Sequence, residues 1–334
     1  MGRLKVLVTG GAGYIGSVVT DELLQRGHQV VVFDNLSRGH RQAVPQAAEL
    51  IVGELADRAA LDRVLQSGKF DAVMHFAALI EAGESMKAPE QFFRNNTANA
   101  LNLLEAMLAA GVKHFVFSST AALFGNPERT PIEEEDSLRP TNAYGESKLL
   151  VERMLAWFHQ IHGLHYASLR YFNAAGAAGP DKGEAHQPET HLIPRILQVA
   201  QGRAQQATIF GTDYPTPDGT CVRDYIHVSD LAQAHLLSLN ALMVREESAG
   251  PLIYNLGNGQ GFSVRQVIEA AREVTGQAIP VMESPRRPGD PAILIASSKK
   301  IQRELGWQPK FPGMRAILES AWRWHRSHPN GYGE

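Results

Sequence analysis

The stretch VTGGAGYIG (8–16) follows the apolar run LKVLVT (4–9) and leads into a helical pattern. Its glycines at positions 11, 13 and 16 have the spacing G-x-G-x-x-G. Glycine permits a tight turn and a close approach of the backbone to a pyrophosphate, and the first turn of the following helix offers N–H groups to that anion. A strand, a glycine turn and a helix in this order predict a dinucleotide-binding unit; a glycine-rich turn without a ligand is the alternative.

An acidic residue in the right place adds to this pattern. Asp34 ends the next apolar run, QVVVF (29–33), eighteen residues after Gly16. A carboxylate there accepts a hydrogen bond from the 2′-hydroxyl of a ribose and repels a 2′-phosphate. The sequence therefore predicts NAD as the cofactor in preference to NADP.

Apolar runs and helical patterns alternate along the first half of the chain. After the first two runs, further strand-like segments lie at 49–53, 71–78, 113–119 and 165–173. Continuous apolar strands that alternate with helices are typical of a parallel sheet covered on both faces. We therefore expect an α/β fold with a Rossmann-type, doubly wound parallel sheet.

The composition of the sequence changes after Asn173. Segment 174–189 is rich in Gly, Ala, Pro and charged residues and is predicted to be a loop. A helical pattern at 229–242 and an apolar run at 252–257 return later, and both are suited to the first sheet. We expect an NAD-binding domain over 1–176, rejoined by segments near 226–258, and a smaller, partly interleaved C-terminal α/β substrate domain over 177–225 and 259–334.

The composition excludes several classes of protein. The chain has 334 residues, 44% hydrophobic and 20% charged, as in an ordinary soluble globular protein. The net charge of −3 argues against a nucleic-acid or membrane-surface partner. A single cysteine, Cys221, rules out an internal disulfide, so we expect a cytoplasmic protein. The thirteen histidines lack the spacing of a helical metal motif, so we expect no metal site.

A candidate general base lies in TNAYGESKLL (141–150). On a helix Tyr144 and Lys148 share one face, because they are four residues apart. A phenol has a pKa of about 10, and a nearby cation favours the phenolate and lowers that pKa. The pair therefore predicts a base for an alcohol proton; a surface tyrosine beside a surface lysine is the alternative.

Several segments together resemble the extended short-chain dehydrogenase/reductase family. They are TGGAGYIG, HFAA, SST, YGESK, RYFN, RDYIHVSDLA and YNLGNG, and the resemblance runs from Val6 to about His328. Within that family the chain is most similar to the UDP-glucose 4-epimerases, through IFGTDYPTPDGTCVRDYIHV (209–228) and RRPGD (286–290). The resemblance implies a nucleotide-sugar isomerase of galactose metabolism that interconverts UDP-glucose and UDP-galactose with tightly bound NAD.

The resemblance also implies residue roles. Tyr144 is expected to be the active-site base, Lys148 its electrostatic partner, and Thr120 a ligand of the sugar 4-oxygen. The sugar C4 is expected to lose a hydride to NAD, to form a 4-ketose, and to regain the hydride on its opposite face. Expected cofactor residues are Gly10, Gly13, Tyr14, Ile15, Gly16, Asp34, Asn35, Glu54, Leu55, Phe76, Ala77, Ala78, Asn95, Tyr144, Lys148 and Phe172. Expected substrate residues are Thr120, Tyr144, Asn173, His191, Leu192, Thr208, Ile209, Phe210, Arg223, Arg287, Asp290 and Leu294.

Four positions depart from the family pattern. Glu54 stands where an aspartate is usual, Ile80 where many members have lysine, and His191 where asparagine is common. Leu294 takes the place of a tyrosine or a smaller residue in the sugar pocket. Leucine is intermediate in size, so acceptance of UDP-N-acetylglucosamine is left open.

Three alternatives remain. The first is another UDP-sugar 4-epimerase, acting on UDP-N-acetylglucosamine, UDP-glucuronate or a UDP-pentose. The second is an NDP-sugar 4,6-dehydratase, which needs Asp-Glu after the catalytic threonine, where this chain has Ala121 and Ala122. The third is a non-catalytic NAD-binding protein, a class that often loses the tyrosine or lysine that this chain keeps.

Two helical segments suggest a homodimer. LLVERMLAWFHQ (149–160) has a broader apolar face than core packing needs, and the helical pattern at 99–110 is also apolar. The two could pair with their copies across a twofold axis as a four-helix bundle. The family resemblance points to the same arrangement.

Overall fold

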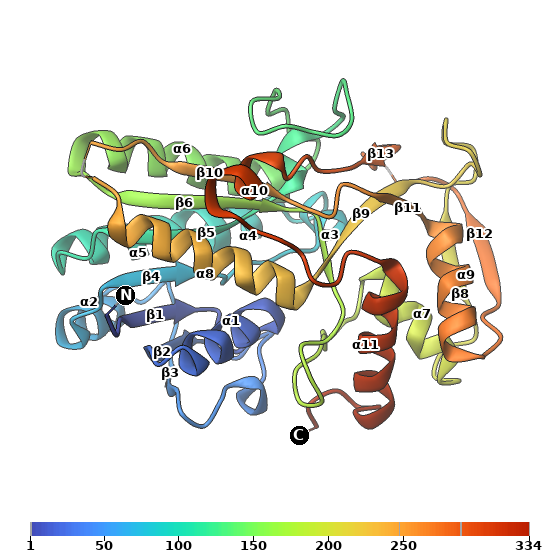
Figure 1. Ribbon diagram of the computed structural model, residues 1–334, viewed down its shortest axis with the longest axis horizontal. Helices are drawn as coiled ribbons and strands as arrows, with labels where there is room; N and C mark the ends of the chain where they lie inside the picture. Colours follow the sequence, from blue (N-terminus) through green and yellow to red (C-terminus); the bar gives the residue numbers. More distant parts are fainter. Residues whose placement is uncertain (1, 247, 288, 334) are drawn as a thin grey trace.

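The computed structural model describes residues 2–246, 248–287 and 289–333. Its centre is a parallel seven-stranded sheet with the order β10-β6-β5-β4-β1-β2-β3 (Figure 1). The strands are β1 (Lys5–Thr9), β2 (Gln29–Asp34), β3 (Glu49–Val52), β4 (Ala72–His75), β5 (His114–Thr120), β6 (His165–Tyr171) and β10 (Leu252–Leu256). The doubly wound order 3-2-1-4-5-6, extended by one strand, confirms the Rossmann-type fold expected from the sequence.

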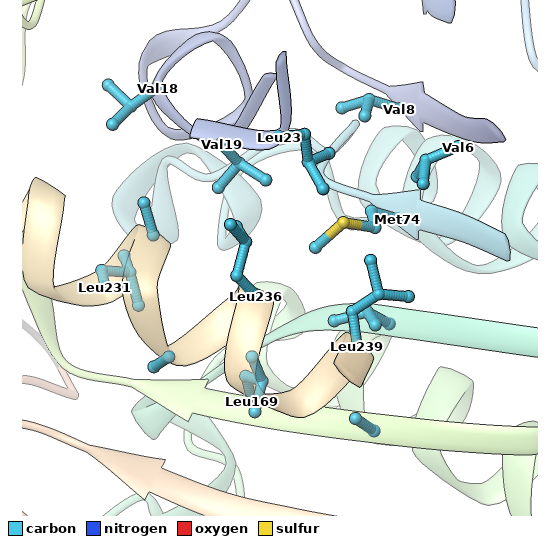
Figure 2. Close-up of a cluster of buried hydrophobic side chains, with 14 of the residues drawn as sticks. Val6, Val8, Val18, Val19, Leu23, Met74, Leu169, Leu231, Leu236 and Leu239 are labelled. Atoms are coloured by element: carbon cyan, nitrogen blue, oxygen red, sulfur yellow. The ribbon is translucent and has the colours of Figure 1, made fainter. Parts of the chain in front are cut away.

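Both faces of the sheet are covered, which is why its strands are continuously apolar. Val6 and Val8 of β1 face one side, toward helices α1 (Tyr14–Gln25) and α8 (Val228–Val244) (Figure 2). Leu7, between them, faces the other side, toward α2 (Arg58–Gly68), α5 (Asn99–Ala109) and α6 (Ala143–His162). Successive side chains of a strand point to opposite faces, so each face needs its own apolar residues.

The chain returns to this sheet late in the sequence. Strand β10 pairs in parallel with β6, and Leu252 lies opposite Ala167. Helix α8 packs on the same face as α1, where Leu236 and Leu239 lie near Leu23 (Figure 2). Residues far apart in sequence thus share one core.

The other elements lie mainly beyond the carboxyl ends of the strands (Figure 1). A four-stranded sheet contains β7 (Asn173–Ala175), β9 (Val222–His227), β11 (Gly261–Ser263) and β13 (Ile293–Leu294), and a two-stranded sheet contains β8 (Ala207–Phe210) and β12 (Val281–Ser284). Helices α7 (Leu192–Ala200), α9 (Val264–Thr275) and α11 (Met314–Ser327) pack there around a separate core. Shorter helical segments are α3 (Ala82–Ser85), α4 (Pro89–Phe92), the π-helical turn Phe93–Ala98, α10 (Lys299–Leu305) and the 3₁₀ turns Arg41–Ala43 and Ala121–Phe124. None of the helices in the described part of the chain has the length and apolar character required to span a membrane.

The strand order creates a crevice between the ends of β1 and β4. These neighbouring strands continue in opposite directions along the sheet, and ligands of doubly wound proteins bind at such a switch point. Gly10 follows β1 with φ of +75°, and a Cβ atom there would lie 2.4 Å from the backbone nitrogen of Ala77. Only glycine therefore allows the two strand ends to approach this closely.

Candidate functional site

A cavity of about 360 Å³ opens at this switch point. It is lined by every residue that the sequence analysis assigned to the cofactor: Gly10, Gly13, Tyr14, Ile15, Gly16, Asp34, Asn35, Glu54, Leu55, Phe76, Ala77, Ala78, Asn95, Tyr144, Lys148 and Phe172. Four of the residues assigned to the substrate also line it, namely Thr120, Asn173, His191 and Leu192, together with Tyr144. The fold thus brings together residues of α1 and α6 with residues that end or follow six of the parallel strands, β1 to β6.

The glycine turn presents the start of α1 to the cavity. Gly13 is the N-cap residue of α1 and has an extended backbone, and a Cβ atom there would meet only the carbonyl oxygen of Gly10, at 3.3 Å. A Cβ atom on Gly16 would lie 2.2 Å from the same oxygen. The turn is therefore tight on its inner side and open toward the cavity. The N–H groups and the positive end of the helix dipole fit a pyrophosphate there.

Asp34 holds the adjacent loop in place. Its carboxylate accepts hydrogen bonds from the backbone N–H groups of Ala12, at 3.0 Å, and Leu36, at 2.8 Å. Burial raises the pKa of Asp34, and these two N–H groups oppose that effect. Beside it, the Asn35 amide donates to both oxygens of Glu54, at 3.1 and 3.2 Å. An acidic, hydrogen-bonded wall at the end of β2 fits the adenosine ribose of NAD.

Helix α6 carries Tyr144 and Lys148 to the opposite side of the cavity. The helix begins at an N-cap, where the side chain of Asn142 accepts a 2.8 Å hydrogen bond from the N–H of Gly145. The Lys148 ammonium donates to the carbonyl oxygen of Ser118, at 2.9 Å, and lies 4.9 Å from the ring centre of Phe117. Lys148 is only 2% exposed. Its position is fixed by β5, the strand that also ends in Thr120.

Burial changes the acidity of the pair in a way that spacing alone did not predict. The pKa of Tyr144 is raised above its ordinary value, because burial and the nearby Glu81 carboxylate outweigh the hydrogen bond with Thr120 that lowers it. Burial also lowers the pKa of Lys148 to about 7. The net pKa of the phenol is therefore raised in this structure, in contrast to the lowering expected from the spacing. Removal from water disfavours the charged form of both groups.

A buried ion pair supports α6 one turn beyond Lys148. The Glu152 carboxylate pairs with the Arg170 guanidinium at 2.6 Å, and both side chains are less than a tenth exposed. It also accepts hydrogen bonds from the hydroxyls of Ser119, at 2.6 Å, and Ser168, at 3.0 Å. Every donor comes from β5 or β6, so the pair fixes α6 against the sheet. Nothing in the local sequence pattern pointed to this network.

The remaining residues assigned to the substrate are not among the described residues that line the cavity; they are Thr208, Ile209, Phe210, Arg223, Arg287, Asp290 and Leu294. Arg287 lies over the ring of Phe210, with 3.9 Å between the guanidinium carbon and the ring centre. Arg223 pairs with Asp290 at 3.0 Å. Leu294 connects this group to the cavity, because it lies opposite Arg223 in the sheet and packs against the hydrophobic cluster that contains Phe172.

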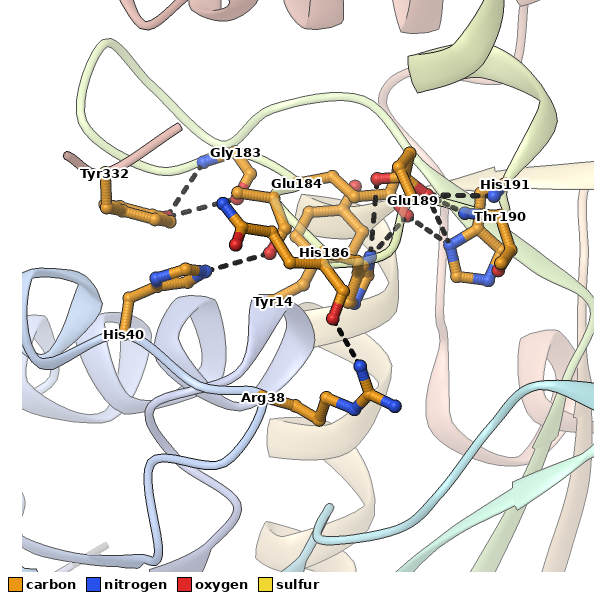
Figure 3. Close-up of polar contacts among 12 residues, drawn as sticks. Tyr14, Arg38, His40, Gly183, Glu184, His186, Glu189, Thr190, His191 and Tyr332 are labelled. Carbon is orange, nitrogen blue, oxygen red and sulfur yellow. Dashed lines mark hydrogen bonds and ion pairs between the residues drawn. The ribbon is translucent and has the colours of Figure 1, made fainter. Parts of the chain in front are cut away.

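The loop before α7 contributes acidic and histidine side chains that the sequence analysis missed. Glu184 and His186 line the cavity beside the expected His191, and Glu189 faces them (Figure 3). We call Glu184, His186, Glu189 and His191 the Glu/His cluster. Its sequence pattern, E-x-H-x-x-E-x-H over 184–191, was a usable signal, but it lies in a loop and does not have helical spacing.

The cluster is strongly coupled electrostatically. Burial alone would lower the pKa of His186, but the carboxylates of Glu184 and Glu189 outweigh it and raise that pKa to about 10. The pKa of His191 is raised in the same way, against the effect of burial. The cluster thus combines two carboxylates and two imidazoles next to the cofactor cavity.

Comparison with known proteins agrees with this site. The model of the NAD dependent epimerase/dehydratase family matches residues 6–257. The chain is 52% identical to a curated UDP-glucose 4-epimerase of Streptococcus mutans, over 99% of both chains, and 50% identical to that of Halalkalibacterium halodurans, over 98% of both. The structure is similar to that of a UDP-glucose 4-epimerase of Bifidobacterium longum in complex with NAD+ and UDP, with a TM-score of 0.93, 37% identity, and coverage of 98% of this chain and 99% of that one. The chain therefore belongs to the NAD dependent epimerase/dehydratase family.

Proposed function

We propose that the protein interconverts UDP-glucose and UDP-galactose by inverting the sugar C4, with NAD as a tightly bound cofactor. One observation carries the proposal. Thr120, Tyr144 and Lys148 line the same cavity as the complete set of expected cofactor residues. The chain is also about half identical, over nearly its full length, to several curated UDP-glucose 4-epimerases.

The residues around the cavity fit NAD. The glycine turn and the start of α1 would hold its pyrophosphate, Asp34 a ribose, and Lys148 and Tyr144 its nicotinamide end. Bound NAD would act as the oxidant: it would accept the C4 hydrogen as a hydride and later return it.

Tyr144 accepts and returns the proton of the sugar 4-hydroxyl. As a phenolate it accepts the proton of the sugar 4-hydroxyl, and it gives the proton back when the alcohol re-forms on the other face. Thr120 lies close enough to Tyr144 to form a hydrogen bond that favours the phenolate. Lys148 lies one helical turn from Tyr144 and is partly charged at neutral pH, and its positive charge also favours the phenolate.

The protein has to bind the nucleotide of the substrate tightly and its sugar loosely, because the sugar must present both faces to the nicotinamide while the nucleotide stays bound. We assign the nucleotide to residues of the expected substrate domain, 177–225 with 259–334. Arg223 and Arg287 are guanidinium groups suited to a diphosphate, and Phe210 lies beneath Arg287. Asn173, His191 and Leu192 line the cavity between the two units.

We likewise propose two units. The NAD-binding unit consists of 1–176 with 226–258, and the substrate unit consists of 177–225 with 259–334.

The structure around Thr120 favours epimerisation over dehydration. Ala121 and Ala122 begin a 3₁₀ turn directly after Thr120 and offer no acid or base for removal of water. Leu294 is half-buried and packs against the cluster that contains Phe172, a lining residue of the cavity, and we propose that it limits the space for a larger sugar substituent. Another UDP-sugar 4-epimerase activity is the second candidate, because one leucine leaves the sugar range open.

The test is incubation of the purified protein with a panel of UDP-sugars, without added cofactor, followed by chromatography. We expect UDP-galactose and UDP-glucose to give the same equilibrium mixture from either side. Conversion of only N-acetylated, uronic or pentose substrates would select the second candidate. A 4-keto-6-deoxy product would identify a dehydratase, and no conversion even with added NAD would reject catalysis.

We also propose a homodimer in the cytoplasm. Trp157 and Ile161 project from α6, each 64% exposed, while Leu149, Val151 and Leu155 of the same helix are buried in the core. An exposed tryptophan and isoleucine on one helix suit a partner surface. The single cysteine, Cys221, is buried and free, which suits a reducing compartment.

A further inference from the structure

The Glu/His cluster lies in the wall between two cavities. Glu184 and His186 line both the cofactor cavity and a second cavity of about 260 Å³, which Glu189 also lines and which is closed on its far side by α11 and the chain beyond it. Four potential metal-ligand atoms, one from each residue of the cluster, lie within 4.8 Å of one another. Four donor groups therefore converge on one point that can be reached from solvent through the cavities.

Most of the separations between these atoms are close to those of a metal site. Oε1 of Glu184 lies 2.6 Å from Nδ1 of His191 and 3.3 Å from Nδ1 of His186. The carboxylate of Glu189 lies 3.6 and 3.7 Å from the same two nitrogens. In tetrahedral zinc sites the bonds are about 2.0–2.1 Å, so neighbouring ligand atoms are about 3.3–3.4 Å apart. Three of the four distances, 3.3, 3.6 and 3.7 Å, are close to this value, and the 2.6 Å contact between Glu184 and His191 has to widen when an ion binds.

The inner atoms of the cluster lack ordinary hydrogen bonds. Within the described residues, Oε1 of Glu184, Nδ1 of His186 and Nδ1 of His191 are buried and have only one another and Glu189 as partners, in ion-pair contacts without the full geometry of a hydrogen bond. Glu184 is only 5% exposed, so its carboxylate depends mainly on protein or ligand partners. Buried polar atoms are nearly always satisfied, and the exceptions require an explanation such as an ion.

The backbone around the cluster is fixed from several sides (Figure 3). The Tyr332 hydroxyl donates to the carbonyl oxygen of Gly183, at 3.1 Å, and accepts from its N–H, at 3.2 Å. A ring nitrogen of His40 bonds the carbonyl oxygen of Ala185, at 3.0 Å, and the Arg38 guanidinium donates to that of Gln187.

The carboxylate of Glu189 is fixed as well. Its Oε1 accepts hydrogen bonds from the backbone N–H groups of Thr190 and His191, both at 2.8 Å. Its Oε2 lies 3.7 Å from Nδ1 of His186. Hydrogen bonds that orient ligand carboxylates in this way are typical of metal sites.

We propose that the Glu/His cluster binds one divalent transition-metal ion of the zinc class. Two imidazole nitrogens and two carboxylate oxygens form a donor set that suits zinc and cobalt and is too rich in nitrogen for calcium or magnesium. The ion joins the loop before α7 into one rigid unit and fixes His191 at the edge of the cofactor cavity. Its role is structural, since the cluster supplies four protein ligands and leaves no open position in a tetrahedral site.

The first test is a zinc titration of untagged protein that has been stripped with a chelator and dialysed at pH 8, with a chromophoric chelator as competitor. We expect one tight site per chain. Glu184→Gln and His186→Gln should each weaken binding by ~100-fold or more. His162→Gln, which removes an exposed histidine at the end of α6, is the matched control and should bind zinc like the original protein.

The second test does not depend on the variants. Cobalt(II) added to the stripped original protein should give the intense visible bands of a tetrahedral ion, and bound zinc should raise the melting temperature. The absence of a tight site, a weak spectrum of a six-coordinate ion, or equal zinc affinity in the variants would each overturn the proposal. Neither readout requires sugar turnover, so the metal site and the proposed epimerase activity can fail separately.

Discussion

The ammonium of Lys148 donates a 2.9 Å hydrogen bond to the backbone carbonyl of Ser118, two residues before Thr120 on β5. This bond ties the helix that carries Tyr144 to the strand that carries Thr120. This contact between α6 and β5 therefore helps to hold the three side chains of the proposed reaction in place. It also keeps Lys148 away from water, and the low pKa of that lysine follows from this burial.

Tyr144→Phe should lower turnover by about 10²–10⁴-fold, because it removes the hydroxyl oxygen assigned to exchange the proton of the sugar 4-hydroxyl. The phenyl ring keeps the volume of the side chain, so UDP affinity and melting temperature should change little. A coupled assay for UDP-glucose formed from UDP-galactose measures the loss. Tyr166→Phe, at a buried phenol in the core on β6, is the matched control. Near-normal turnover in the Tyr144 variant would reject its role as the base.

Lys148→Met should abolish most activity and yet stabilise the fold at low pH. A buried ammonium is unfavourable, and an apolar side chain of similar length should raise the free energy of unfolding at pH 6 by about 1–4 kcal/mol. The folded pKa of about 7 lies below the ordinary 10.5, so between these values the unfolded chain holds a proton that the folded chain has lost. The original protein therefore gains stability as the pH rises from about 7 to 10.5, and the advantage of the variant should shrink over that range. Denaturant unfolding at pH 6, 8 and 10 checks this; a constant difference would contradict the assigned burial effect.

Asp34→Asn should weaken NAD binding by about 10–100-fold, because it removes a charge-assisted hydrogen bond to the ribose. Discrimination against NADP should fall, since the repulsion of the 2′-phosphate disappears with the charge. Calorimetric titration of cofactor-free protein with each dinucleotide measures both effects. Glu273→Gln, which removes an exposed carboxylate on α9, should alter neither. Unchanged NAD affinity in the Asp34 variant would count against its assignment.

A double substitution, Trp157→Glu with Ile161→Glu, should convert the proposed dimer into a monomer. Both side chains are 64% exposed, so the added charges meet water in the monomer but would be buried in an interface. Light scattering at micromolar concentration measures the mass. Val244→Glu is the control, because Val244 is 76% exposed at the end of α8, on the other face of the sheet. A monomer mass for the original protein would exclude the dimer.

Glu152→Gln should lower the free energy of unfolding by about 3–5 kcal/mol, because it leaves the Arg170 guanidinium buried without its counter-charge. Thermal and denaturant unfolding measure the change. Glu146→Gln on the same helix is the control, since its ion pair with Arg153 is long, at 3.8 Å, and exposed. A small effect at Glu152 would show that α6 is held mainly by its apolar contacts.

The sequence by itself determined the sheet, the glycine turn and the phenol with its lysine. Each of these depends on local spacing: apolar runs of strand length, the G-x-G-x-x-G turn, and two residues one helical turn apart. The cofactor residues that the family resemblance assigned also line one cavity, since they follow strands whose ends meet at one edge of the sheet. Only the tertiary structure decided the acidity of Tyr144 and Lys148, the support from Glu152, and the convergence of the Glu/His cluster. Those properties depend on burial and on contacts between segments such as β5 and β6, or α11 and the loop before α7. Such contacts are set by the packing of the whole chain, and local spacing does not encode them.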